Sequence, residues 1–350
     1  MTCSRPLDDT TEAPPPRQEV HQSSFQAVLV HDFLRAYRRE QTLHLATVIN
    51  YHPPRKEDMT DLPLVWAVVL AWNQKDETVA CLDSLLHSDY PQMQLLVVDN
   101  GSTDGTAETV QQLYPQVMVV RSPVNLGIAA GYNLGLNHAL AHRAEYILVA
   151  NNDIVVDESM VRHLAESMAD RPEVGMIMPK IYHYYGDQYR LWCTGARWRK
   201  FPPSVKMMGY NVKDAPRYSR SRELEFAPSC CLLIRRQVVE HIGGFDPGYF
   251  FYSDDWDYSA RVRAAGYHIR FDPAAKLWHK VSVSTQKSEK PSRWWYTMGR
   301  STVRFYRQHS TSSALITYSA WFTVREIVKL KPRRVLPFLT GVKHELACKS

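Results

Sequence analysis

The feature that most constrains this chain is an alternation of short apolar runs with amphipathic stretches between residues 65 and 153. The apolar runs have the length of strands, and the stretches between them have the spacing of helices. We expect strands at residues 65–72, 93–100, 116–122 and 146–153, with helices at 76–88, 106–114 and 129–142. This order predicts an α/β fold with a mostly parallel central sheet, flanked by helices, whose ligand sites lie beyond the carboxyl ends of the strands.

Polar residues follow each of the first two predicted strands. Asn73 and Asp76 follow the first, and the run DNGSTDGT at residues 99–106 follows the second. Such a run forms a tight turn whose polar side chains and free backbone N–H groups can hold a ligand. An ordinary helix cap by Ser102 or Asp104 explains one of these residues but not the whole run.

A glycine-rich segment, NLGIAAGYNLG at residues 125–135, follows the third predicted strand. It has neither the GxGxxG pattern of dinucleotide sites nor the Gly-Lys-Ser/Thr of a phosphate loop. Glycines spaced four apart, at Gly127, Gly131 and Gly135, let a helix pack closely on the sheet or let a ligand approach the backbone. The sequence leaves both interpretations open.

The fourth predicted strand ends in Asn151, Asn152 and Asp153, polar groups that are out of place in a buried strand. A carboxylate flanked by amides at a strand end suits a hard divalent cation such as Mg²⁺ or Mn²⁺, which would in turn bind a diphosphate. The plainer alternative is a β-turn held by Asx hydrogen bonds.

Three aspartates, Asp254, Asp255 and Asp257, follow an aromatic run at residues 249–252 and begin a predicted helix. The helix dipole favours acidic residues in a first turn, which is the plainer explanation. A carboxylate among apolar rings can also acquire a raised pKa and serve as a general base. Further along, His279 follows a short predicted strand, and imidazole is a common metal ligand.

Six segments of this chain, in this order, resemble the family 2 glycosyltransferases with the GT-A fold. They are LAWNQKDETVACLDSLL, VVDNGSTDGT, NLGIAAGYNLG, NNDIVV, GGFDPGYFFYSDDWDYSARVRAAGY and WHKVSVS. Each segment alone is a weak signal, but six in the family's order are specific. Within the family the chain looks most like the rhamnosyltransferase-type enzymes that build bacterial surface polysaccharides, and the resemblance covers about residues 64–285.

The resemblance implies inverting transfer of a sugar from a nucleotide diphosphate sugar to a hydroxyl of a glycan or lipid-linked acceptor. We expect dTDP-rhamnose as the donor, with a UDP-sugar as the alternative. By their positions in the motifs, Asn73, Asp99 and Ser102 should line the pocket for the nucleotide base and ribose. The remaining donor-binding residues that we expect are Asp76, Asn125, Gly127, Asn151 and Asn152.

The resemblance also assigns the metal ligands and the base. Asp153 takes the last position of the family's DxD-like metal motif, and His279 matches a histidine that approaches the metal or diphosphate. Asp255 matches the second acid of the family's Glu-Asp pair, the general base that deprotonates the acceptor hydroxyl. Two positions depart from the pattern: Asn151 replaces the first acid of DxD, and Asp254 replaces the usual Glu. Whether Asp254 or Asp255 is the base stays open, with the motif register favouring Asp255.

Two other function classes are compatible with a sheet of this kind. A nucleotidyltransferase shares the sheet but needs a glycine-rich, basic loop after the first strand, and AWNQKDETV has no glycine. A non-catalytic sugar-nucleotide-binding or scaffold protein of the same fold is the alternative that Asn151 and Asp254 keep open.

Residues 180–226 are rich in Tyr, Trp and Arg, and in the GT-A fold the acceptor side lies there. Aromatic faces suit sugar rings, while a loop packed on the core is an equal alternative. The segment LEFAPSCCLLIRR resembles the strand before the catalytic helix, which predicts that Cys230 and Cys231 are buried.

We expect three parts: an N-terminal extension at 1–60, partly disordered with one helix, a GT-A domain at 61–285, and a basic helical region at 286–350. The last part carries 13 lysines and arginines against 3 acidic residues. Leu315, Tyr318 and Phe322 form one helix face, which suits an interfacial helix on an anionic membrane. Packing of this face on the protein itself is the alternative. No nucleic-acid-binding motif accompanies the charge, so we expect no nucleic acid partner.

The location follows from the same sequence. No stretch approaches the roughly 20 apolar residues of a membrane-spanning helix, and we find no secretory signal. The six cysteines show no CxxC pair. We therefore expect a cytoplasmic protein with reduced thiols, peripheral on the inner face of the cell membrane.

Overall fold

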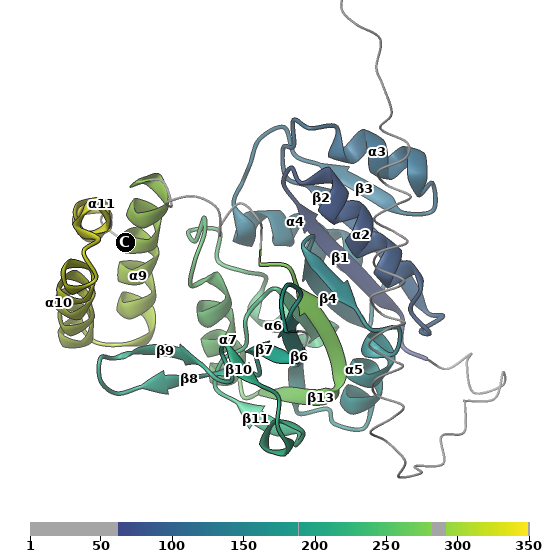
Figure 1. The fold of residues 1–350 in the computed structure, drawn as a ribbon. Helices are drawn as coiled ribbons and strands as arrows, with labels where there is room; N and C mark the ends of the chain where they lie inside the picture. The colour runs from purple at the N-terminus through teal and green to yellow at the C-terminus, as the bar shows by residue number, and fades with distance from the viewer. Residues whose placement is uncertain (1–61, 188, 282–291, 349–350) are drawn as a thin grey trace, which may run out of the picture. The chain divides into compact units, whose positions relative to one another are not determined.

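The computed structural model describes residues 62–187, 189–281 and 292–348. The predicted N-terminal extension and both predicted domain boundaries lie outside these residues. The described part has a mixed α/β core with a mostly parallel central sheet and a helical C-terminal region, as the sequence predicts (Figure 1).

The strands of the described part are β1 (Val65–Ala71), β2 (Met93–Asp99), β3 (Met118–Arg121), β4 (Tyr146–Asn151), β5 (Ile154–Val156), β6 (Val174–His183), β7 (Arg190–Cys193), β8 (Ala196–Arg199), β9 (Ser204–Met207), β10 (Val212–Lys213), β11 (Arg222–Leu224), β12 (Cys231–Arg235) and β13 (His268–His279). The central sheet has 11 of these strands and follows the order β10-β7-β6-β12-β4-β1-β2-β3. β13 joins it by pairing with β6, β5 and β11, and β8 pairs with β9 in a separate hairpin.

The helices of the described part are α2 (Lys75–Leu86), α3 (Thr106–Leu113), α4 (Ile128–Ala141), α5 (Met160–Ala169), α6 (Arg236–Ile242), α7 (Asp254–Ala264), α9 (Ser292–His309), α10 (Ser312–Val328) and α11 (Val335–Ala347), with short 3-10 turns η2 (Pro216–Tyr218) and η3 (Pro332–Arg334). Each of the three helices predicted before residue 150 is present, with ends that differ by one residue or a few.

The centre of the sheet explains why the first apolar run shows no alternation. β1 pairs in parallel with β2 and β4, and all seven of its residues are buried. A parallel strand covered on both faces is apolar throughout. A Cβ on Gly131 would lie 2.6 Å from Leu70 Cδ1, and one on Gly135 would lie 2.1 Å from Val68 Cγ1. These two glycines of α4 therefore serve close helix packing on β1.

The fourth predicted strand is shorter than expected. β4 ends at Asn151, a turn occupies Asn152 and Asp153, and the chain resumes as β5. β5 pairs antiparallel with the end of β13, so that Ile154 lies opposite His279. The prediction of one strand to residue 153 is wrong because the polar pair turns the chain at the sheet edge.

The C-terminal helices form a small bundle beside the β8–β9 hairpin (Figure 1). Phe322 of α10 packs against Phe338 of α11, with ring centroids 4.1 Å apart, and Tyr318 stacks on Tyr306 of α9 at 5.6 Å. Ser301 of α9 donates a hydrogen bond to the backbone oxygen of Phe251 at 2.8 Å, which ties the bundle to the segment before α7.

The face proposed from the sequence for membrane contact is therefore buried. Leu315, Tyr318 and Phe322 are 7%, 8% and 0% exposed, because this face of α10 covers α9 and α11. The alternative of packing on the protein itself is the one that the structure supports for these three residues. In the described part, no helix combines the length and the apolar character needed to cross a membrane.

Candidate active site

The polar interruption after β4 faces the end of β13. His279 Nε2 lies 3.1 Å from Asp153 Oδ1, and the two residues are 6% and 5% exposed. The antiparallel pairing of β5 with β13 fixes this approach, since His279 ends β13 next to the turn that holds Asp153. The Trp192 ring meets the imidazole edge to face, with centroids 4.6 Å apart. Two side chains of types that can bind a metal, far apart in sequence, thus meet at one sheet edge.

The separation of these two atoms fits a shared divalent cation. An octahedral Mg²⁺ binds its ligands at about 2.1 Å, which places neighbouring ligand atoms about 3 Å apart. Carboxylate oxygen and imidazole nitrogen are both suitable donors for Mn²⁺ as well. Among the described residues no group of three or more acidic, histidine or cysteine side chains could hold a metal. A cation here would therefore take its remaining ligands from a bound diphosphate and water.

The two asparagines before Asp153 brace the turn. Tyr132 donates its hydroxyl to Asn151 Oδ1 at 2.8 Å and also lies 3.1 Å from the backbone oxygen of Ser229. Asn152 Nδ2 donates to Thr78 Oγ1 at 2.9 Å. The amide at position 151, where the family carries an acid, is thus used to anchor the end of β4 to α4. Tyr132 and Thr78 were not predicted from the sequence, because their partners lie 19 and 74 residues away.

The loops after β1 and β2 are joined into one cradle. The backbone N–H of Asn73 donates to Ser102 Oγ at 2.8 Å, and Asn73 Oδ1 accepts from the Thr103 N–H at 2.9 Å. Asp99 is 1% exposed, and its Oδ1 accepts from the Ser102 N–H at 2.9 Å. Three of the predicted nucleotide-pocket residues therefore lie together at the end of two neighbouring parallel strands. Asp76 lies exposed in the first turn of α2.

The loop after β3 connects this cradle to the segment before α7. Asn125 Oδ1 accepts from the Gly127 N–H at 2.8 Å and from Asn100 Nδ2 at 3.2 Å, which holds the loop in shape. The next N–H, that of Ile128, donates to the backbone oxygen of Phe250 at 2.9 Å. Gly127 has φ +84°, and a Cβ there would lie 2.4 Å from the Phe250 oxygen. Only glycine fits both the backbone angle and the close approach.

The acidic pair lies at the start of α7, directly after two residues in the left-handed region, Tyr252 (φ 74°) and Ser253 (φ 67°). Asp254 is 3% exposed, and Ser229 Oγ donates to its Oδ2 at 3.3 Å. Asp255 is only half-buried, and its Oδ1 accepts a hydrogen bond from the backbone N–H of Trp256 at 2.9 Å. Asp257 forms its own ion pair with Arg261, although its charge also raises the pKa of Asp254.

Burial gives both carboxyl groups of the pair an unusual proton affinity. It raises the pKa of Asp254 to about 6, even though the Ser229 hydroxyl opposes the shift. Burial also raises the pKa of Asp255 well above its usual range, and the adjacent charge of Asp254 adds to this effect. The two groups therefore titrate as a pair, and Asp255 is the more exposed of the two.

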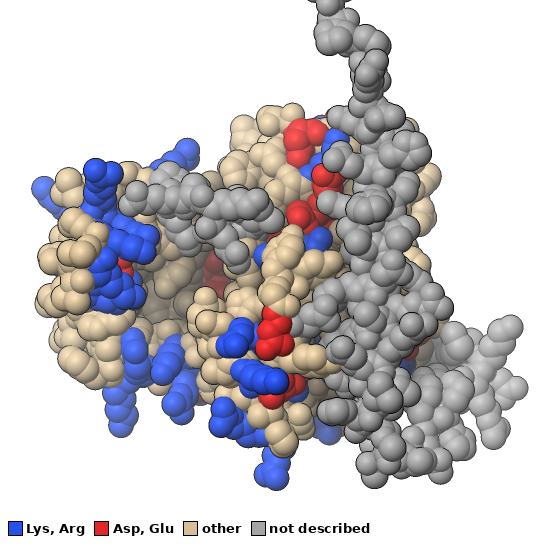
Figure 2. Space-filling model, in the orientation of Figure 1, with Lys and Arg blue, Asp and Glu red and all other residues tan. Residues whose placement is uncertain are grey.

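Both acidic sites lie close enough to the Cys230 thiol to act on it electrostatically. Burial raises the pKa of the Cys230 thiol well above its usual range, and the charges of both Asp153 and Asp255 add to the shift. Cys230 and Cys231 are buried, as predicted, where β12 begins beside β4. Figure 2 shows a hollow between the C-terminal helices and the α/β part, with acidic colour in its depth.

A further charged pair at this edge was not singled out from the sequence. Lys280 Nζ lies 2.5 Å from Glu77 Oε2 and 5.0 Å from the centre of the Tyr184 ring. Lys280 is 5% exposed, and its backbone N–H donates a hydrogen bond to the backbone oxygen of Asp153 at 2.9 Å. Its position next to His279 was the available signal, since neighbouring residues at a strand end share the same edge.

A family model described as glycosyl transferase family 2 matches residues 66–243. The chain belongs to this family. The fold, the order of motifs and the acidic groups at the carboxyl edge of the sheet agree with this assignment.

Proteins similar in sequence to this chain include two bacterial relatives. An N-acetylglucosaminyl-diphospho-decaprenol L-rhamnosyltransferase of Mycobacterium tuberculosis is 27% identical over 256 residues, covering 61% of this chain and 80% of the relative. A probable glycosyltransferase of Bacillus subtilis is 23% identical over 313 residues, covering 84% of this chain and 64% of the relative. The first of these confirms the rhamnosyltransferase-like resemblance of the sequence.

A solved structure supports the fold. The structure of GalNAc-T7 with UDP, GalNAc and Mn²⁺ superposes with a TM-score of 0.55 at 13% identity. The match covers 80% of this chain and 62% of that one. At this identity the likeness concerns the fold alone, and it agrees with the GT-A fold that the motifs predicted.

Proposed function

We propose that this glycosyltransferase moves a sugar, with inversion at the anomeric carbon and with a bound divalent cation, from a nucleotide diphosphate sugar to a hydroxyl of a glycan or lipid-linked acceptor. The observation that carries the proposal is the pairing of two acidic sites at one edge of the sheet. One is Asp153 with His279, and the other is Asp254 with Asp255. The first suits a cation and diphosphate, and the second suits proton removal.

Asp255 is the proposed general base. Its half-exposed carboxylate accepts the proton of the acceptor hydroxyl as that oxygen attacks the anomeric carbon. The bond between the anomeric carbon and the diphosphate oxygen breaks in the same step, and a single displacement inverts the configuration. Asp254 stays buried and hydrogen-bonded to Ser229, where its charge raises the proton affinity of Asp255. We therefore propose Asp255 rather than Asp254 as the base, in line with the motif register.

The donor site is proposed at the cradle of Asn73, Asp99 and Ser102, with the diphosphate directed toward Asp153 and His279. These last two residues would hold Mg²⁺ or Mn²⁺, which when bound neutralises charge on the leaving diphosphate. Asn151 and Asn152 keep the Asp153 turn in place through their hydrogen bonds. dTDP-rhamnose is the favoured donor because the mycobacterial relative is named as an L-rhamnosyltransferase, and a UDP-sugar is the second candidate.

We further propose that the tip of the C-terminal bundle contacts an anionic membrane. Val328, Leu330 and Leu336 are 74%, 89% and 74% exposed around the turn between α10 and α11. Exposed basic residues accompany them, namely Lys329, Lys331 and Arg333. Figure 2 shows lysine and arginine side chains gathered on this bundle. Apolar side chains ringed by cations match the surface of the cytoplasmic leaflet, where anionic lipids lie. Contact there would suit a lipid-linked acceptor in surface polysaccharide synthesis.

The reaction is tested by release of nucleoside diphosphate from a panel of nucleotide sugars, with Mg²⁺, with Mn²⁺ and with EDTA. We expect turnover of one donor. This turnover should depend on the cation and should increase when membrane lipid extract supplies the acceptor. If a donor binds but no cation or extract yields turnover, the alternative of a non-catalytic sugar-nucleotide-binding protein takes precedence. If none of the nucleotide sugars in the panel binds, both the proposed transfer reaction and the alternative of a sugar-nucleotide-binding protein are wrong.

A further inference from the structure

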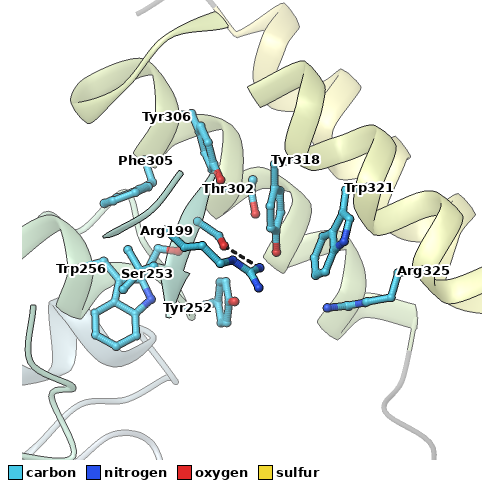
Figure 3. A pocket seen from close by; sticks show the side chains of 12 residues that line it. Arg199, Tyr252, Ser253, Trp256, Thr302, Phe305, Tyr306, Tyr318, Trp321 and Arg325 are labelled. Atoms are coloured by element: carbon cyan, nitrogen blue, oxygen red, sulfur yellow. Dashed lines mark hydrogen bonds between the residues drawn. The ribbon is translucent and has the colours of Figure 1, made fainter. Parts of the chain in front are cut away.

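A separate pocket of about 150 Å³ lies beside the start of α7. Ser253 and Trp256 line it, and these two residues flank the acidic pair of α7 in the sequence. The opposite wall comes from the β8–β9 hairpin, α9 and α10 (Figure 3). An occupant of this pocket would therefore lie close to the first turn of α7, which carries the proposed base.

The pocket has a cationic lining without an acid. Its 12 lining residues include Arg199 and Arg325 and no aspartate or glutamate. The two guanidinium groups lie over the same indole ring, that of Trp321, at 5.4 Å and 4.5 Å from its centre. Figure 3 shows the Arg199 guanidinium reaching between Tyr252, Tyr318 and Trp321. Stacking on an aromatic face holds a guanidinium in a fixed orientation with its N–H groups available.

The positive charge is only partly balanced. Arg325 pairs with Glu326, which lies outside the lining, at 2.7 Å, and the same carboxylate also binds Arg334 at 3.2 Å. Arg199 donates to the backbone oxygen of Pro202 at 3.2 Å and to Ser204 Oγ at 3.0 Å. Neither of those groups is charged, and among the described residues no carboxylate forms an ion pair with Arg199. Glu326 is thus shared by Arg325 and Arg334, and Arg199 has no carboxylate partner among the described residues.

The side chains of the lining favour a ligand whose atoms accept hydrogen bonds. Besides the two arginines, the lining includes the hydroxyl-bearing side chains of Tyr252, Ser253 and Tyr318. A sugar hydroxyl donates a hydrogen bond and is usually met by a carboxylate or amide oxygen, which this lining lacks. A phosphate ester oxygen only accepts at neutral pH, and arginine is suited to bind it with two parallel hydrogen bonds. The lining thus favours a phosphate over a sugar ring.

The same helix face continues from the pocket to an apolar surface. Trp321, Val324 and Val328 are spaced three and four residues apart on α10 and therefore share one face. Trp321 lines the pocket, while Val324 and Val328 are 61% and 74% exposed. An anionic group held at Trp321 would thus have exposed apolar side chains leading away from it, toward the tip that we propose to contact a membrane.

We propose that this pocket binds the phosphate or diphosphate that joins the acceptor sugar to a lipid. The inference rests on the proposed function and defines its acceptor as a lipid-linked sugar phosphate. Arg199 and Arg325 hold the phosphate oxygens, the lipid follows α10, and the sugar is left at Asp255. Both arginines act in acceptor binding and neither takes part in bond breaking.

The test is calorimetric binding of a short-chain prenyl diphosphate to protein whose donor site is already filled by excess nucleoside diphosphate and Mg²⁺. The wild-type protein should bind this probe and bind the matching prenyl alcohol at least about tenfold more weakly. Arg199→Gln and Arg325→Gln should each weaken binding of the diphosphate by about tenfold or more, because each removes hydrogen bonds to a charged group. Arg197→Gln is the matched control, since Arg197 is exposed on the same strand and does not line the pocket.

Donor binding in every variant serves as the check on folding and separates the two proposals. If all variants bind the donor and the prenyl diphosphate equally well, the pocket assignment is wrong even where transfer is observed. Equal binding of the prenyl alcohol would overturn the phosphate assignment in the same way. If the wild-type protein transfers no sugar but the variants show the expected differences in prenyl diphosphate binding, the proposed reaction is wrong and the pocket assignment stands. Arg199→Lys keeps the positive charge but lacks the parallel N–H donors of a guanidinium. It should therefore weaken binding less than Arg199→Gln.

Discussion

The carboxyl pair at the start of α7 makes a prediction about pH that distinguishes its two members. Burial raises the pKa of Asp254 to about 6, and burial with the charge of Asp254 raises the pKa of Asp255 further above its usual range. The base must be ionised to act, so activity should fall as the pH falls through these raised values. Asp254→Asn removes the neighbouring charge and keeps an oxygen that can accept from Ser229.

The expected effect of Asp254→Asn is a shift of the acidic limb of kcat/KM to lower pH. Two groups that titrate as a pair interact by more than about 1 pKa unit, so the shift should reach about 1 unit, or about 1.4 kcal/mol. The assay is initial transfer rate from pH 5 to pH 9 at saturating cation, compared with the wild-type enzyme. An unshifted limb would refute the electrostatic coupling. Complete loss of activity at every pH, with Asp255→Asn still active, would make Asp254 the base.

The same substitution has a consequence for stability, and the sign follows from the direction of the shift. A carboxyl whose folded pKa is raised stabilises the fold most at pH values below its ordinary pKa, and this contribution is lost as the pH rises through the raised value. Asp254→Asn cannot ionise at that position, so its thermal midpoint should decline less than that of the wild-type protein between pH 5 and pH 8. Thermal unfolding monitored by circular dichroism measures the difference.

Three further predictions concern the proposed metal site, the turn at Gly127 and the tip of the C-terminal bundle. Asp153→Asn should raise the cation concentration for half-maximal turnover by about 10- to 100-fold, measured by Mn²⁺ titration; an unchanged titration would remove Asp153 from the metal site. Gly127→Ala should lower the free energy of unfolding by at least about 1–3 kcal/mol, because strain at φ +84° is joined by a 2.4 Å clash. Gly105→Ala, at φ +78° with nothing within 4 Å, is its control and should cost less in urea unfolding. Leu330→Glu should reduce sedimentation with anionic vesicles severalfold, whereas Leu113→Glu on α3 should not; equal loss would exclude the bundle tip as the contact.

Much of the fold could be predicted because the signals for it are local. The apolar run of β1 and the alternation of strands with helices lie in short stretches of sequence, and turn residues mark where each strand ends. The grouping of Asn73, Asp99 and Ser102 followed from the rule that parallel strands bring their carboxyl ends together. These parts of the site needed no knowledge of distant contacts.

The parts that could not be predicted depend on pairing between distant segments. The hydrogen bond from Tyr132 to Asn151 requires the packing of α4 on the sheet, which periodicity alone does not orient. The apolar face of α10 illustrates the same limit, since helical spacing identifies a face without naming what covers it. Phe322 turned out to pack on Phe338, and the exposed apolar residues lie on other positions of the same helix. The cationic pocket joins β8 to α10, more than 100 residues apart, and has no sequence signature.

The most direct test of the central claim is transfer by the wild-type enzyme and by Asp255→Asn, with the anomeric configuration of the product determined by NMR. The account predicts a product whose anomeric configuration is opposite to that of the donor. It also predicts a loss of about 100- to 10,000-fold in kcat for Asp255→Asn, with donor affinity unchanged, because a general base contributes an effect of that size. A product with the donor's configuration, or an Asp255→Asn enzyme with wild-type turnover, would contradict the single displacement assisted by Asp255.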